Sequence, residues 1–191
     1  MKIQHRAPAQ PLLILVGLAL ATLAAPRAIT AQVEAAAGII VAPDAGLEVT
    51  PVGPTVGVSA TVPGTGGVLV LEAAVGRTDF SVFGEEFHDT HYGLTASGQV
   101  PLLRGSTGLM LRLGFGAHGV RQTIETSTPG GGGANWYETI VPSVVVSRTL
   151  TSATDLVLSV SDALLGPVGA LLDPDEFDLE HRIRILVGVR F

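Results

Sequence analysis

The sequence predicts an all-β fold in which eight antiparallel strands close into an up-and-down barrel that crosses a membrane. Apolar and polar residues alternate with period two in short runs after residue 31, so each strand has one apolar face and one polar face. The connections alternate between short turns and long loops, as they do in membrane barrels. No run in this region reaches eighteen consecutive apolar residues, so a spanning helix is not expected there.

The N-terminus has the layout of a secretory signal peptide. Lys2 and Arg6 precede an apolar run over residues 11–25, and small residues follow up to a cleavage site after Ala31. The apolar run is short for a permanent membrane anchor. We therefore expect residues 1–31 to be a cleavable signal peptide and residues 32–191 to form one exported barrel domain.

The composition argues against several classes of function. The chain has 11 lysines and arginines against 17 acidic residues, and no lysine follows Lys2. Nucleic-acid binding is not expected, because it needs clustered cations. The absence of cysteine excludes disulfides, thiolate catalysis and cysteine metal sites.

The first four predicted strands cover residues 33–42, 53–62, 67–78 and 90–102. Apolar side chains occupy alternate positions in each of them. These positions are Ala35, Ala37, Ile39 and Val41; Val56, Val58, Ala60 and Val62; Leu69, Leu71, Ala73 and Val75; and Tyr92, Leu94, Ala96 and Val100. The positions between them are mostly small or polar, which predicts strands with two different environments.

The last four predicted strands cover residues 107–122, 136–148, 154–162 and 181–191. Their apolar positions are Leu109, Leu111, Leu113 and Phe115; Ile140, Pro142, Val144 and Val146; Leu156, Leu158 and Val160; and Ile183, Ile185, Val187, Val189 and Phe191. In the final strand, Arg182, Arg184 and Arg190 lie on the opposite face. An apolar face opposite arginines suits a strand between lipid and a polar lumen.

The connections fall into two groups by length. The short ones, residues 63–67, 103–106 and 149–153, are expected to be hairpin turns. The long ones, residues 43–52, 79–89, 123–135 and 163–180, are expected to be loops at the other end of the barrel. An even number of strands then places both ends of the barrel domain on the side of the short turns.

This architecture, ending in phenylalanine, resembles the small eight-stranded outer-membrane barrels, such as the OmpA transmembrane domain, OmpX and related outer membrane protein β-barrel families. The resemblance covers residues 32–191. It implies a bacterial outer-membrane location, contact with lipid, and recognition of the C-terminal strand by the barrel assembly machinery. Val187, Val189 and Phe191 provide the apolar and aromatic residues of that signal, whereas its glycine is displaced to Gly188.

The polar faces predict a filled lumen, because a barrel of eight strands is about wide enough for its own side chains. The side chains expected to point inward are Glu72, Gln99, Arg112, Asp155, Arg182 and Arg184. One interpretation is a structural plug of ion pairs, since a buried charge must be paired. The alternative is a gate in which glutamate and arginine exchange partners to admit ions.

Two further groups of residues are candidate sites. The predicted long loops carry the acidic residues Asp44, Glu48, Asp79, Glu85, Glu86, Asp89, Glu125, Asp173, Asp175, Glu176 and Asp178. They are either solvated charge or ligands for Ca²⁺ or Mg²⁺. His88, Asp89 and His91 are either polar surface or a group that binds a transition metal or activates a serine. No Gly-x-Ser-x-Gly motif supports the enzymatic reading.

The favoured function is therefore that of a non-enzymatic outer-membrane barrel with acidic extracellular loops and a structural, adhesion or surface-interaction role. We expect no cofactor and no catalytic residue. Three alternatives remain at this point: a narrow ion channel with a Glu/Arg lumen gate, a lipid-modifying barrel enzyme, and a soluble secreted β-barrel. The soluble barrel would bury the apolar faces inside, whereas the membrane barrel exposes them.

Overall fold

The computed structural model describes residues 32–43, 50–64, 67–82, 84–124, 134–167 and 179–191. The predicted signal peptide lies outside these residues. The strands are β1 (Gln32–Val41), β2 (Val52–Gly64), β3 (Gly67–Val82), β4 (Glu85–Leu103), β5 (Thr107–Ile124), β6 (Asn135–Thr151), β7 (Thr154–Leu165) and β8 (Glu180–Arg190). None of the described residues forms a helix long and apolar enough to cross a membrane.

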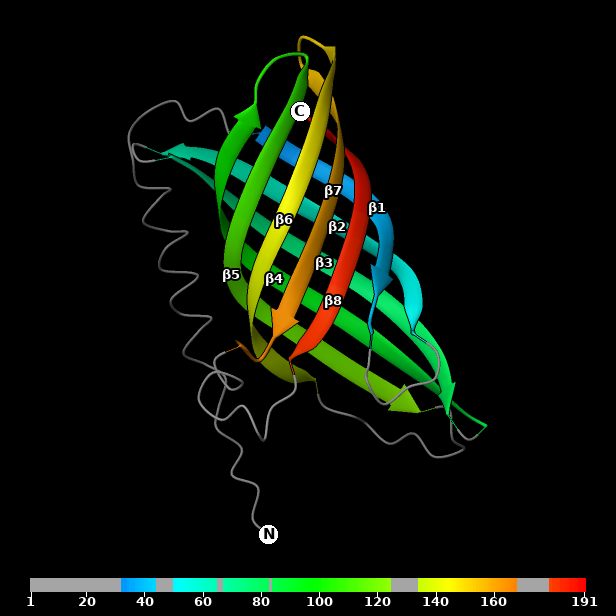
Figure 1. The fold of residues 1–191 in the computed structure, drawn as a ribbon. Coiled ribbons are helices and arrows are strands. Elements are labelled where there is room, and N and C mark those ends of the chain that lie inside the picture. Colours follow the sequence, from blue (N-terminus) through cyan, green and yellow to red (C-terminus); the bar gives the residue numbers. More distant parts are fainter. Residues whose placement is uncertain (1–31, 44–49, 65–66, 83, 125–133, 168–178) are drawn as a thin grey trace. The chain divides into compact units, whose positions relative to one another are not determined.

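The eight strands form a closed antiparallel barrel in chain order, shown in Figure 1. Each strand pairs with its sequence neighbours, and β1 pairs with β8, which closes the ring. Register partners followed from Val68 around the barrel, through Arg112 and Ile40, lead back to β3 at Thr78, ten residues further along. Such a stagger tilts the strands relative to the barrel axis. The predicted fold is confirmed.

The apolar side chains face outward. Leu111, Leu158 and Ile185 are 42%, 43% and 38% exposed, whereas Arg112 and Arg184 are only 5% and 4% exposed. In a soluble barrel this arrangement would place the apolar side chains in water and bury the charges, at a large cost in free energy. The structure therefore contradicts the soluble secreted barrel and fits a wall that faces hydrocarbon.

The barrel has two different ends. The connections after β2, β4 and β6 are short and lie at one end, called here the turn end; the connections after β1, β3, β5 and β7 lie at the other, called the loop end. β1 begins and β8 finishes at the turn end, where Phe191 and Val33 exchange two backbone hydrogen bonds of 2.9 and 3.1 Å. Both ends of the described barrel therefore lie on the side of the short turns.

One predicted long loop is wrong. Residues 79–89 are mostly strand, because β3 continues to Val82 and β4 begins at Glu85. The reversal uses Gly84, whose φ of 82° suits glycine. Four of the acidic residues assigned to loops, Asp79, Glu85, Glu86 and Asp89, thus lie on strands. The remaining seven, Asp44, Glu48, Glu125, Asp173, Asp175, Glu176 and Asp178, lie outside the described residues.

The hairpin of β3 and β4 is held by aromatic stacking on one face and by backbone pairing up to its tip. Phe80 and Phe87 are register partners, and their rings stack with centroids 5.2 Å apart and planes 8° apart. They lie on the same strand face as Thr78 and Asp89, the face that continues into the lumen below. Backbone pairing continues between Val82 and Glu85, so the ladder runs to the tip.

Candidate functional site: the charged lumen

A cluster of charges fills the lumen near the turn end. Glu34 of β1 accepts hydrogen bonds from Arg190 of β8 at 2.9 Å and from Arg112 of β5 at 3.4 Å. Gln99 accepts a third bond, from Nε of Arg112, at 2.9 Å. Asp155 lies at 4.0 Å from Arg190. One carboxylate thus bridges two guanidinium groups across the barrel, and this arrangement compensates charges that are almost fully buried.

A second ion pair lies further toward the loop end. Arg184 of β8 forms an ion pair with Glu72 of β3, with nitrogen and oxygen 2.7 Å apart, and the arginine side chain is 5% exposed. Closer still to the loop end, Arg182 donates to Glu180 at 2.7 Å and to the carbonyl of His181 at 2.8 Å. Alternate residues of β8 therefore place successive arginines on the inner face, each with a carboxylate from the described part of the lumen.

All six residues that the sequence predicts to point into the lumen lie on the inner face. Glu72 and Arg112 occupy similar depths by sequence, yet Glu72 pairs with Arg184 and Arg112 pairs with Glu34. Glu34 and Arg190 were not among the six. Arg190 lies on the predicted polar face of the last strand, and period two likewise turns Glu34 inward, because it alternates with Ala35.

A buried histidine pair completes the described lumen toward the loop end. His91 of β4 and His118 of β5 are 2% and 5% exposed. Nδ1 of His91 lies 3.3 Å from Nε2 of His118, and Nε2 of His91 lies 2.9 Å from the hydroxyl of Thr78. A hydrogen bond between two imidazoles needs one N–H nitrogen and one bare nitrogen, so the two rings are not both protonated.

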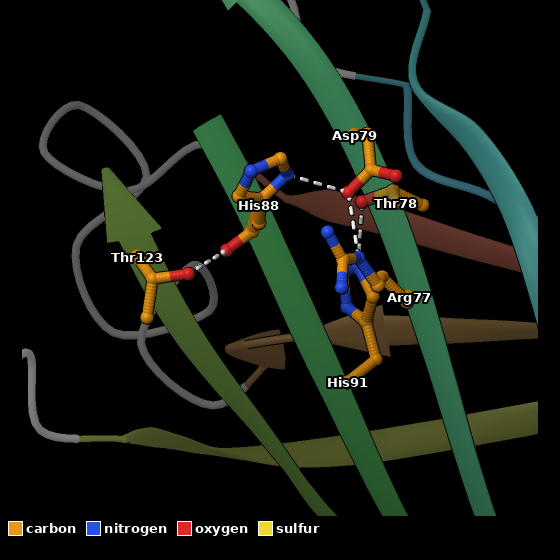
Figure 2. A network of polar contacts seen from close by, with 6 residues as sticks. All are labelled: Arg77, Thr78, Asp79, His88, His91 and Thr123. Atoms are coloured by element: carbon orange, nitrogen blue, oxygen red, sulfur yellow. Dashed lines mark hydrogen bonds and ion pairs between the residues drawn. The ribbon is translucent and has the colours of Figure 1, made fainter. Parts of the chain in front are cut away.

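The group of His88, Asp89 and His91 is divided between the two faces of β4, because side chains alternate along a strand. Figure 2 shows His91 beside Thr78, whereas His88 points to the other face and contacts Asp79 at 2.7 Å. Asp79 also accepts a bond from Nε of Arg77 at 2.8 Å. Within the described residues, no group of three or more His, Cys, Asp or Glu side chains could hold a metal ion.

The C-terminal residues lie on the outer wall. Val187 and Phe191 are exposed on the lipid-facing side of β8, and Val189 shares that face. Val187 and Val189 are register partners of Ala37 and Ala35 in β1. The strand that carries the predicted assembly signal is therefore also the strand that closes the barrel.

Two solved structures have folds similar to that of this chain. Neisserial surface protein A (NspA) matches over 84% of this chain and 95% of its own, with 15% identity and a TM-score of 0.56. Ail, the attachment invasion locus protein of Yersinia pestis, matches over 84% of this chain and 97% of its own, with 12% identity and a TM-score of 0.50.

The chain has the outer-membrane β-barrel fold. The outer wall fits that membrane, since strand after strand presents aliphatic side chains outward and polar ones inward. NspA and Ail are small barrels other than OmpA and OmpX. These matches therefore do not show the narrower resemblance to OmpA and OmpX. No family model matches the sequence, and no curated protein matches it.

Proposed function

We propose that this protein is a non-enzymatic outer-membrane barrel whose lumen is a structural core and whose loop end serves surface interaction or adhesion. The charge network carries the first part of the proposal. Glu34 holds two arginines and Glu72 holds a third, so the inner face is occupied by side chains that hold one another. Thr78, the hydroxyl that contacts His91, is 1% exposed, and a lipid substrate on the outer wall would not reach it.

The hairpin of β3 and β4 supports the second part. Its strands run 16 and 19 residues, whereas about 9–11 are enough to cross a bilayer, so the hairpin extends beyond the membrane at the loop end. It presents the stacked Phe80 and Phe87 on one face and Arg77, Asp79 and His88 on the other. Aromatic and arginine side chains are enriched where proteins bind one another. Ail, which shares the fold, is named for attachment.

Adherence of cells that display the protein would test this role. Expression in a bacterium without other adhesins should increase attachment to host cells or matrix, and Phe80→Ser with Phe87→Ser should reduce it. The matched control is Phe115→Ser, which removes a phenylalanine from the lipid-facing wall and leaves the hairpin unchanged. Attachment that is unchanged by expression, with the barrel detected at the cell surface, would contradict the proposal.

Three partners belong to the same proposal. The outer wall contacts membrane lipid, and the assembly machinery recognises β8 through Val187, Val189 and Phe191. Divalent cations bound by acidic loop residues are the third. A Phe191→Ala variant that folds from urea into vesicles yet fails to reach the outer membrane in cells would separate recognition of β8 from intrinsic stability.

A further inference from the structure

The register of β3, β4, β5 and β6 aligns two rows of side chains on the outer wall near the loop end. The lower is an aromatic row, in which Tyr92 pairs with Gly119 and Gly119 pairs with Trp136. The rings of Tyr92 and Trp136 lie with centroids 6.5 Å apart. A Cβ on Gly119 would lie 3.0 Å from the Trp136 ring, so the glycine lets the indole lie flat across β5. Amphipathic aromatic rings at this position mark the membrane interface.

The next row toward the loop end is basic. Arg77 of β3 pairs with Thr90 of β4, and Thr90 pairs with Arg121 of β5. Both arginines are exposed, and their Cα atoms are separated by two strand spacings, about 10 Å. Because arginine side chains are long and flexible, two at this spacing can reach one phosphate group or two neighbouring ones.

The two guanidinium groups remain available to a ligand. Arg77 uses Nε for Asp79, which leaves its terminal nitrogens for another acceptor. Hydrogen bonding from Arg77 holds the pKa of the Asp79 carboxyl below its ordinary value, so this residue stays ionised beside the arginine. Within the described part of the chain, no carboxylate pairs with Arg121. The row therefore keeps a net positive charge.

An apolar groove lies directly below the two rows. It has a volume of about 420 Å³ and is lined by residues of β2, β3 and β4, with Trp136 at one end. Its side chains include Val56, Val58, Ala73, Val75, Tyr92 and Leu94. Ala73 is small, which leaves room between the larger side chains on either side of it. An apolar groove in a wall that faces hydrocarbon suits an acyl chain.

We propose that this part of the outer wall binds a lipid whose headgroup carries phosphate. An acyl chain occupies the groove, the polar linkage lies against Tyr92 and Trp136, and Arg77 and Arg121 hold the phosphate. The order of groups along the wall is the order of groups along such a lipid: apolar, amphipathic, then anionic. A soluble polyanion would use the arginines alone and would leave the groove and the aromatic row without a role.

Trp136 is the only tryptophan of the chain and lines the groove, so its fluorescence reports on this site. The barrel would be folded into phosphatidylcholine vesicles that contain increasing fractions of brominated phosphatidic acid or brominated phosphatidylcholine, since bromine quenches the indole on contact. We expect brominated phosphatidic acid to quench at about a five-fold lower mole fraction, because two arginines near a membrane surface each favour an anionic lipid.

The test variant is Arg77→Gln with Arg121→Gln, which should bring the two lipids to equal quenching. Arg104→Gln is the matched control, because Arg104 is an exposed arginine in a turn at the opposite end. Heat-modifiable migration on a gel confirms that each variant is folded. Equal quenching in the wild type, or a preference that persists in the double variant, would overturn the proposal. So would heparin binding that depends on both arginines in a protein without any headgroup preference.

Discussion

Replacement of Glu34 by glutamine should strongly destabilise the barrel. The carboxylate is 7% exposed and lies at 2.9 Å from Arg190 and at 3.4 Å from Arg112. Glutamine keeps the shape but removes the charge, so two buried guanidinium groups lose their shared counterion. Removal of one partner of a buried ion pair costs about 3–5 kcal/mol. We expect about 3 kcal/mol, because Gln99 still accepts from Arg112 and Asp155 remains near Arg190.

Urea unfolding in lipid vesicles, followed by Trp136 fluorescence, would measure this loss. With a denaturant dependence of about 1–3 kcal/mol per molar, the midpoint should fall by about 1–3 M urea. Asp155→Asn is the matched control. Asp155 is 27% exposed and 4.0 Å from its arginine, so its loss should cost less than about 1 kcal/mol.

A loss below about 1 kcal/mol for Glu34→Gln, or an equal loss for Asp155→Asn, would refute the reasoning. A double-mutant cycle with Arg112→Gln provides a second readout. If Glu34 and Arg112 interact as described, the double variant should lose less than the sum of the two single variants. Additive losses would show that the two side chains are not coupled.

Three further predictions follow from other parts of the barrel. Leu158→Arg places a charge on the lipid-facing wall and should cost about 2–4 kcal/mol of unfolding free energy in vesicles, whereas a gain in water-soluble folded protein would contradict the outward orientation. Gly116→Ala should cost about 1–3 kcal/mol, because its Cβ would overlap the backbone carbonyl of Leu94; an unchanged urea midpoint would show that the strands can move apart there. In planar bilayers the wild type should give no discrete conductance steps. The double variant Glu72→Ala with Arg184→Ala should produce such steps, and conductance steps in the wild type would favour the gated channel.

Period-two alternation predicted the orientation of the barrel wall because lipid and lumen impose different requirements on the two faces of each strand. Leu111 and Arg112 are adjacent in sequence, and they lie 42% and 5% exposed on opposite sides of β5. A one-residue error in register would have exchanged all such positions, so the alternation is a strong constraint.

Period-two alternation does not predict the strands where β3 and β4 leave the membrane. Beyond Val75 and Tyr92 both faces of the hairpin can accept polar residues, so Asp79, Glu85 and Glu86 resemble a loop in the sequence. Backbone hydrogen bonds nevertheless continue, because strand pairing does not require an apolar face. The length of this hairpin therefore was not visible in the hydrophobic pattern.

The sequence also did not predict which charges pair in the lumen. Arg112 and Glu34 are 78 residues apart, and their contact depends on how far the strands are staggered around the ring. Alternation says that both residues point inward but not at which depth they meet. The arginine row on the outer wall depends on the same register, since Arg77 and Arg121 align only through Thr90.

Accessibility along β5 tests the central claim most directly, namely that aliphatic side chains face lipid around a lumen of paired charges. The chain has no cysteine, so spin labels can be attached at single engineered cysteines from Leu109 to Phe115 in vesicles. The account predicts that labels at positions 109, 111, 113 and 115 collide freely with lipid-dissolved oxygen, while those at 110, 112 and 114 are protected. The opposite alternation, or equal accessibility at all positions, would contradict it.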